Sequence, residues 1–68
     1  MTKTNVVENR RKELHLSQED LANQLGISRQ YYNAIENLKR FPSIKLAKEL
    51  ANVLQIDWTI FFDNGVNT

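Results

Sequence analysis

A single glycine, Gly26, separates two short helical patterns within residues 18–37, and this arrangement constrains the fold more than any other feature of the chain. Ser17 and Asp20 have the spacing of a capping box at the start of the first pattern. Gly26 follows its last apolar residue, at the position where a left-handed backbone ends a helix without steric cost to glycine. Ser28 can cap the second pattern. The sequence therefore predicts two short helices joined by a tight turn.

Further helices are predicted on both sides of this segment. The first covers about residues 5–14 and places Val7, Arg11 and Leu14 on one face. Pro42 disfavours a helical continuation, so residues 38–42 are expected to form a loop. Ser43 then caps the clearest amphipathic helix of the chain, which has apolar residues at i, i+1, i+4, i+5 and i+8: Leu46, Ala47, Leu50, Ala51 and Leu54.

A short fifth helix is expected from Asp57, which can cap it, through Phe62, with Asn64-Gly65 as its stop. No segment alternates apolar and polar residues over the length of a strand. We therefore expect an all-α fold, a compact bundle of five short helices, in one domain over residues 1–68 with an ordered core of about 5–63. A domain of this size buries only about 60% of its unfolded surface, so dimerisation would add to its stability.

The composition argues against several classes of protein. The chain has no cysteine, and its one histidine, His15, has no second histidine at ligand spacing, so no cofactor or metal site is predicted. Ser17, Ser28 and Ser43 all fit helix caps, and there is no glycine-rich phosphate loop, so no catalytic residue is predicted. The longest apolar run has three residues, far short of a membrane span. These features predict a non-enzymatic, cytoplasmic protein.

The net charge of +1 is unevenly distributed. Residues 28–48 contain five basic residues against Glu36 alone, whereas residues 49–68 contain three acidic residues and no basic one. A polyanion-binding surface requires such a basic half, although a solvated basic face has the same sequence pattern.

Residues 18–37 also fit the twenty-residue frame of a helix-turn-helix, in which two short helices pack at a steep angle. With Gln18 first, Ala22 stands where the helices approach most closely and Gly26 stands in the turn. The apolar positions of the frame are then all filled, by Leu21, Leu25, Ile27, Tyr32 and Ile35. Seven constrained positions matched together are far more specific than a lone glycine.

On these residues the sequence resembles the phage-repressor and Cro family, the Cro/CI-type or lambda-repressor-like helix-turn-helix domains. The resemblance covers roughly residues 6–62, is strongest in LSQEDLANQLGISRQYYNAIEN and continues in PSIKLAKELANVL. It implies a five-helix bundle that binds double-stranded operator DNA as a symmetric homodimer. We therefore expect a sequence-specific transcriptional regulator, acting as a repressor, whose third helix (about 28–36) enters the major groove.

Helical spacing separates the two faces of that third helix. If Tyr32 and Ile35 point inward, then residues 29, 33 and 37 and residues 30 and 34 form outward rows. Arginine can pair with guanine O6 and N7, and asparagine or glutamine with adenine N6 and N7. The predicted base contacts are Ser28, Arg29, Gln30, Asn33 and Ala34.

A second set of residues is predicted to contact the DNA backbone, which adds affinity without selecting a sequence. Gln18 stands at the start of a helix, where free amides and the helix dipole favour a phosphate. In the resembling family a glutamine here also supports the residues that read bases. The other predicted backbone contacts are Tyr31, Asn37, Lys39, Arg40 and Lys45.

The resemblance also implies a structural ion pair between Arg11 and Glu36, because the family commonly pairs an arginine of the first helix with a glutamate at the end of the third. A partly buried pair of this kind fixes the orientation of helices. Two positions that are often glycine in the family are His15 and Leu38 here. Leucine tolerates a left-handed backbone poorly, so the loop after Leu38 is expected to differ from the family average.

Aromatic residues gather near the C-terminus. Trp58 and Phe61 are expected to close the core, which leaves Ile60 or Phe62 for an exposed patch suited to a dimer interface. The alternative to a DNA regulator is a protein-interaction module, such as an antitoxin subunit with a protein partner. That role would call for a partner-binding tail, and the few residues after Phe62 favour the DNA regulator.

Overall fold

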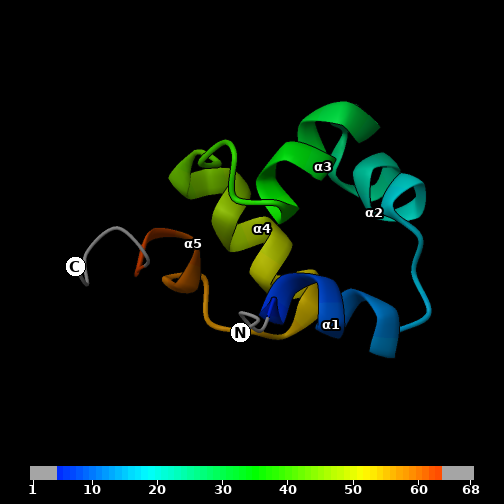
Figure 1. The fold of residues 1–68 in the computed structure, drawn as a ribbon, viewed down its shortest axis with the longest axis horizontal. Coiled ribbons are helices and arrows are strands. Elements are labelled where there is room, and N and C mark those ends of the chain that lie inside the picture. The colour runs from blue at the N-terminus through cyan, green and yellow to red at the C-terminus, as the bar shows by residue number, and fades with distance from the viewer. Residues whose placement is uncertain (1–4, 64–68) are drawn as a thin grey trace.

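The chain folds into a bundle of short helices, seen in a computed structural model that describes residues 5–63 (Figure 1). No strand occurs among these residues, so the all-α prediction is confirmed for the described part. The Asn64-Gly65 stop lies outside the described residues. The five helices are α1 (Val6–Glu13), α2 (Gln18–Leu25), α3 (Arg29–Glu36), α4 (Ile44–Leu54) and α5 (Ile60–Asp63).

The predicted serine caps begin three of the helices. At α2 the hydroxyl oxygen of Ser17 accepts a hydrogen bond from the Asp20 amide at 2.9 Å, and the Ser17 amide donates to the Asp20 carboxylate at 3.1 Å, which completes the capping box. Ser28 and Ser43 cap α3 and α4 through the hydroxyl alone, which accepts from the amides of Tyr31 and Leu46. Asn5 is the cap of α1 rather than its first residue, since its side chain accepts from the Glu8 amide at 3.0 Å. Each cap satisfies a backbone donor that the helix itself leaves free.

Four of the residues between 5 and 63 adopt a left-handed backbone, and one of them had no signal in the sequence. Gly26 ends α2 with φ 71°, as predicted. His15 (φ 60°) and Leu38 (φ 64°) turn the loops after α1 and α3 at the two positions where the family often has glycine. Gln55 (φ 59°) ends α4, which nothing in its identity predicted. Leu38 is the residue at which this backbone is sterically most costly.

The core forms where α4 packs against α1 and α2, while α2 packs against α3 (Figure 1). All five predicted apolar residues of α4 are buried, and Leu21, Ala22, Tyr32 and Ile35 of the helix pair join them. The packing of the predicted inward faces is therefore confirmed. It fixes the position of α3 and leaves the outer side of that helix at the surface.

The C-terminal part differs from the prediction in two ways. First, α5 begins at Ile60 rather than after Asp57, because the Asp57 carboxylate accepts from both the amide (3.1 Å) and the hydroxyl (2.9 Å) of Thr59 and holds residues 57–59 in a turn. Second, Phe61 is buried as expected and Trp58 packs against the core, but Ile60 and Phe62 are half-buried. Among the residues that the structure describes, the most exposed large apolar side chain is instead Phe41, at 68%, with its ring stacked on Phe62.

Candidate nucleic-acid interface

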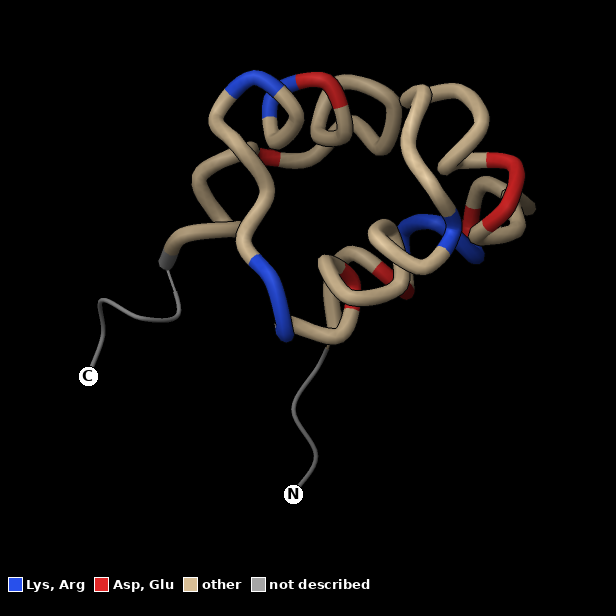
Figure 2. Tube along the Cα trace, turned by 90° about the horizontal axis from the view of Figure 1, so that it is seen from above, with Lys and Arg blue, Asp and Glu red and all other residues tan. Residues whose placement is uncertain are grey.

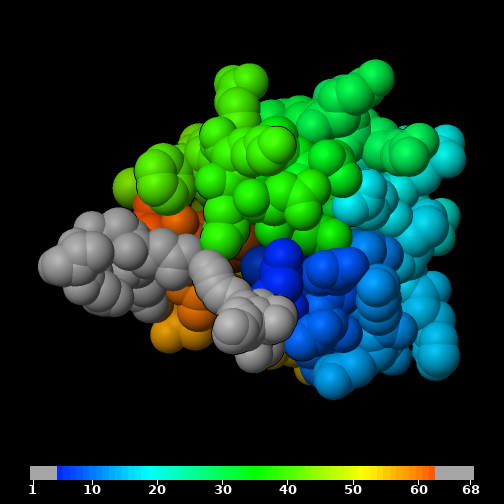
Figure 3. All heavy atoms as spheres, in the orientation of Figure 1, coloured from blue at the N-terminus to red at the C-terminus, as the bar shows by residue number. Residues whose placement is uncertain are grey.

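The outer face of α3 is polar and accessible. Arg29, Gln30 and Asn33 are exposed, whereas Tyr32 and Ile35 on the opposite side are fully buried. In Figure 3 the side chains of α3 and of the loop after it form the upper surface of the molecule and project from it. Helical spacing predicted that these residues point outward, and in the structure they lie on one face of α3.

Ser28 and Ala34, the other two predicted base contacts, occupy the margins of this face. Ser28 is exposed, but its hydroxyl oxygen accepts from the Tyr31 amide as the helix cap, which leaves the hydroxyl proton as its donor. Ala34 is half-buried, and its carbonyl oxygen accepts from the amides of Lys39 (2.8 Å) and Arg40 (3.3 Å). The loop after α3 therefore folds back on the end of that helix.

A surface hollow joins the two helices of the motif. It is lined by Gln18 from the first turn of α2 and by Arg29, Gln30 and Asn33 from α3. One residue predicted to contact the DNA backbone thus lies beside three predicted to contact bases. Two chemical kinds of hydrogen-bonding group line it: the guanidinium of Arg29 and the carboxamides of two glutamines and one asparagine.

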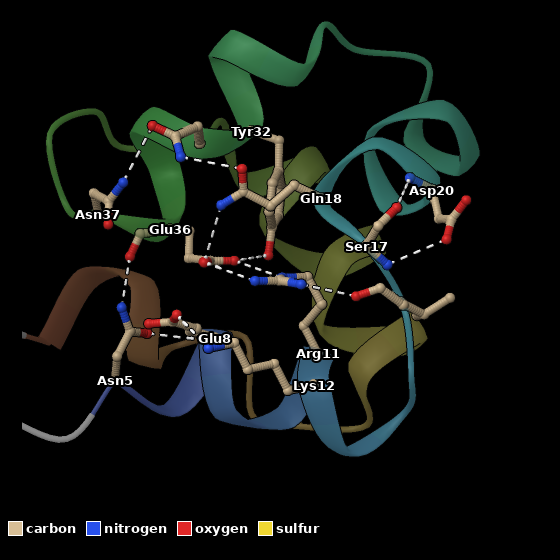
Figure 4. A network of polar contacts seen from close by, with 12 residues as sticks. Asn5, Glu8, Arg11, Lys12, Ser17, Gln18, Asp20, Tyr32, Glu36 and Asn37 are labelled. Atoms are coloured by element: carbon tan, nitrogen blue, oxygen red, sulfur yellow. Dashed lines mark hydrogen bonds and ion pairs between the residues drawn. The ribbon is translucent and has the colours of Figure 1, made fainter.

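Beneath this hollow, the Glu36 carboxylate is 2% exposed and accepts hydrogen bonds from three side chains (Figure 4). Arg11 donates through Nε to Oε1 at 2.9 Å and through Nη2 to Oε2 at 3.3 Å. The Tyr32 hydroxyl donates to Oε1 at 2.6 Å, and Gln18 Nε2 donates to Oε2 at 3.1 Å. The Arg11–Glu36 ion pair implied by the family resemblance is present, and the bonds from Tyr32 and Gln18 were not foreseen.

The buried cluster stabilises the charged form of both ion-pair partners. Burial acts to raise the pKa of Glu36, but the hydrogen bonds from Arg11, Tyr32 and Gln18 outweigh it and hold that pKa below its ordinary value. The hydrogen bond to Glu36 raises the pKa of Arg11 against the cost of burial. Burial, together with the hydrogen bond to Glu36, raises the pKa of Tyr32 well above its ordinary range. Glu36 is therefore an anion that only accepts hydrogen bonds, and Tyr32 is a neutral donor.

A chain of amides continues from Glu36 to the surface. Gln18 Oε1 accepts from Asn33 Nδ2 at 3.1 Å, and Asn33 Oδ1 accepts from Asn37 Nδ2 at 3.1 Å. Asn33 was predicted to contact bases, and Gln18 and Asn37 were predicted to contact the DNA backbone. The i, i+4 spacing of Asn33 and Asn37 was a signal for the second contact, but nothing in the sequence indicated the first.

The remaining predicted backbone contacts lie around the loop after α3. The guanidinium of Arg40 stands over the ring of Tyr31, 5.3 Å from its centroid, in a cation–π contact. Lys39 is exposed beside Arg40 in this loop. Lys45 is exposed in the first turn of α4, on a different helix from the rest of the set.

The charge pattern of residues 28–48 is more one-sided at the surface than in the sequence. All five basic residues of this segment are exposed, and its single carboxylate, Glu36, is buried and paired. Over the described part of the whole molecule, basic and acidic positions occur on several elements (Figure 2). Arg29, Lys39 and Arg40 of this set lie on α3 and the loop after it, while Lys45 and Lys48 lie on α4.

Comparisons with known proteins agree with this geometry. A family model described as helix-turn-helix matches residues 7–61. The uncharacterized HTH-type transcriptional regulator YqaF of Bacillus subtilis (strain 168) is 42% identical over 57 residues, which are 84% of this chain and 75% of that protein. The ImmF control region 10 kDa protein of Bacillus phage phi105 is 36% identical over 55 residues, 81% of this chain and 61% of that protein.

An uncharacterized HTH-type transcriptional regulator of Methanocaldococcus jannaschii is 57% identical over 37 residues, 54% of this chain and 56% of that protein. The chain thus covers less than two thirds of the Bacillus phage protein and of the Methanocaldococcus jannaschii protein. No solved structure gives a significant match.

Two further features bear on the kind of site. None of the helices between residues 5 and 63 has the length and apolar character needed to span a membrane. Across the same residues, no three histidine, aspartate or glutamate side chains gather into a group that could hold a metal ion.

Proposed function

Because the chain belongs to the Cro/CI-type helix-turn-helix family, we propose that it is a sequence-specific repressor that inserts α3 into the major groove of double-stranded operator DNA. The observation that carries the proposal is the outer face of α3, where Arg29, Gln30 and Asn33 are exposed and share a hollow with Gln18. In a helix-turn-helix, the second helix reads base edges with its N-terminal residues. The family is typically non-enzymatic, and the proposal includes no catalytic step.

Base reading falls to the exposed donors and acceptors of α3. Arg29 is suited to guanine, through its two-pronged guanidinium, and Gln30 and Asn33 are suited to adenine. Ser28 and Ala34, at the margins of the same face, would complete the contact with a hydroxyl donor and with a methyl group that packs on a thymine methyl.

Backbone contacts come from residues that border this face. Lys39 and Arg40 extend the cationic surface beyond the end of α3, and the guanidinium of Arg40 lies over the ring of Tyr31. Gln18, Asn37 and Lys45 would add further phosphate contacts. Between residues 28 and 48, five exposed cations without an exposed carboxylate favour a polyanion as the ligand.

We place the dimer contact at the apolar surface around Phe41. Phe41 stacks on Phe62, and Leu38 and Ile44 are also more than half exposed. A symmetric dimer would present two α3 helices to half-sites one helical turn apart, roughly 34–36 Å. Such a protein represses transcription by occupying its operator. It acts in the cytoplasm, where the DNA that it binds is located.

The decisive experiment is selection of bound sites from a random double-stranded DNA pool, followed by sedimentation of the protein with and without the selected site. The proposal expects enrichment of a two-fold symmetric site bound by two copies of the chain. A Phe41→Ser variant should bind a single half-site and sediment as a monomer. A pool that enriches no sequence would overturn the proposal and favour the competing role, an interaction module such as an antitoxin subunit.

A further inference from the structure

Two separate contacts hold Arg40 against α3, although this residue lies four positions beyond the end of that helix. Its guanidinium stands over the Tyr31 ring, and its amide donates to the carbonyl oxygen of Ala34. We propose that Tyr31 is a positioning residue: its ring, rather than its hydroxyl, holds the Arg40 guanidinium beside the outer face of α3 for contact with a DNA phosphate. This inference rests on the proposed function, because it concerns a backbone contact next to the proposed base contacts.

The first step is the path of the loop after α3. Leu38 adopts a left-handed backbone with φ 64°, which turns the chain at the end of the helix. The amides of Lys39 and Arg40 then donate to the Ala34 carbonyl oxygen at 2.8 and 3.3 Å. Because Ala34 lies within α3, these two hydrogen bonds fold the loop back on the helix and place the backbone of Arg40 beside its last turn.

The second step is the direction of the Arg40 side chain. Tyr31 lies three residues before Ala34, which is about 4.5 Å nearer to the start of the helix. The Arg40 Cζ is 5.3 Å from the centroid of the Tyr31 ring, within the reach of a cation–π contact. Tyr31 is half-buried and packs against the core, so the ring is a fixed support. The Arg40 side chain therefore runs back along α3, toward the half of the helix that carries Arg29 and Gln30.

The third step is what the guanidinium can still bind. None of the ion pairs between residues 5 and 63 includes Arg40, and its side chain is exposed. Its N–H donors are therefore available for a phosphate, which arginine can bind through two parallel hydrogen bonds. A side chain that is already held in place loses less conformational entropy when it binds. The Tyr31 ring thus raises affinity without contacting DNA itself.

Two variants of Tyr31 separate the ring from the hydroxyl. Tyr31→Phe keeps the ring, whereas Tyr31→Leu replaces it with another apolar side chain. Fluorescence anisotropy measures binding to the duplex selected from the random pool and to an unrelated duplex of the same length. We expect Tyr31→Leu to weaken binding to both by roughly two- to five-fold, the effect of an exposed cation–π contact, and Tyr31→Phe to bind as the unchanged protein does. Equal losses in the two variants would assign the contact to the hydroxyl and overturn the inference.

A double-variant cycle tests whether the effect of Tyr31 passes through Arg40. In the Arg40→Gln background, Tyr31→Leu should have no further effect. Lys39→Gln is the matched control, because Lys39 is the neighbouring exposed cation and no aromatic ring between residues 5 and 63 holds it. In that background Tyr31→Leu should keep its full effect. The same loss in both backgrounds would mean that Tyr31 only packs against the core, and the inference would be wrong.

The salt dependence of binding separates the position of the charge from its presence. Arg40→Gln should lower the slope of log affinity against log salt by about 1, whereas Tyr31→Leu should keep the slope, because the charge remains. Arg40→Lys tests the contact without any change to α3. Lysine keeps the charge but lacks the planar group that stacks on a ring, so binding should weaken by at least about two-fold at an unchanged slope. Full affinity in Arg40→Lys would overturn the inference.

A measurement on the protein without DNA provides an independent test. The Arg40 Nε–H signal in a 15N-labelled sample should shift in Tyr31→Leu and stay close to its place in Tyr31→Phe, because both aromatic rings shield a group that lies over them. An unchanged signal in a Tyr31→Leu protein that keeps its helical circular dichroism would overturn the inference. A random pool from which no sequence is enriched would overturn the proposed function, whereas the cycle on the unrelated duplex would still decide the role of Tyr31.

Discussion

Arg11 on α1 and Glu36 at the end of α3 form a buried ion pair, with Nε 2.9 Å from Oε1, and the two residues are 8% and 2% exposed. The pair ties α3 to α1, the first helix of the bundle. Asn5 adds a second tie, since its Nδ2 donates to the Glu36 carbonyl oxygen at 2.9 Å. The orientation of α3 therefore depends on polar contacts as well as on the core.

Arg11→Met should lower the free energy of unfolding by about 3–5 kcal/mol, because it leaves the Glu36 charge buried without its partner. The double variant Arg11→Met, Glu36→Gln should lose clearly less, because no charge is then buried alone. Urea denaturation followed by Trp58 fluorescence measures both. Equal losses in the single and the double variant would contradict this account of the pair.

Acid should destabilise the protein through Glu36. Its pKa is lower in the folded state than the ordinary 4.5, so the folded state holds the charged form more strongly than the unfolded chain does. The resulting stability is fully present above about pH 4.5 and is lost as the pH falls through the lower folded pKa. With Glu36→Gln, the free energy of unfolding should depend less on pH below that value. With Glu19→Gln, at an exposed position, it should fall as it does in the unchanged protein. Denaturation curves between pH 6 and pH 3 decide between these outcomes.

Leu38→Gly should stabilise the protein by about 0.5–1 kcal/mol. Leu38 has φ 64°, a left-handed conformation that costs a residue with a side chain roughly 1–2 kcal/mol. Glycine avoids this cost, but the greater conformational entropy of glycine in the unfolded chain offsets part of the stabilisation. The leucine side chain is 52% exposed, so little packing is lost. Leu38→Ala is the control, since it removes the side chain but keeps the left-handed cost. The midpoint temperature of thermal unfolding, measured at low protein concentration, should rise for Leu38→Gly and should not rise for Leu38→Ala.

Arg29→Ala should weaken binding to the selected DNA site by about 1–3 kcal/mol and relax the preference at one base pair, because Arg29 is exposed at the start of α3 and lines the hollow with Gln18. Fluorescence anisotropy with the selected site and its single-base substitutions measures both effects. Loss of equal size on selected and random DNA would place Arg29 on the backbone instead.

Lys39→Ala should weaken binding to all sequences and reduce the slope of log affinity against log salt by about 1, because one phosphate contact is removed. Lys12→Ala serves as the control, since Lys12 lies on α1 and pairs with Glu8 at 3.0 Å. Binding titrations over a range of salt concentrations compare the two slopes. An unchanged slope for Lys39→Ala would remove this residue from the set of phosphate contacts.

The sequence by itself determined the helices, their caps and their inward faces. Ser17, Ser28 and Ser43 begin helices and Gly26 ends one, because capping and left-handed turns are local chemistry that a few neighbouring residues decide. The buried stripe of α4 followed equally from spacing. The turn at Asp57 was not predicted. The Asp57 side chain accepts a hydrogen bond from the Thr59 amide, and α5 begins only at Ile60.

Only the tertiary structure decided which side chains meet. Gln18 and Asn33 are fifteen residues apart, and their hydrogen bond exists because α2 and α3 pack with the start of one beside the outer face of the other. The stacking of Phe41 on Phe62 likewise joins the loop before α4 to α5. Such contacts depend on how whole helices are placed against a shared core, which periodicity along one helix does not contain. The sequence thus predicted the residues of the candidate interface one by one, and the packing of the bundle brought Gln18 into contact with both Asn33 and the buried Glu36.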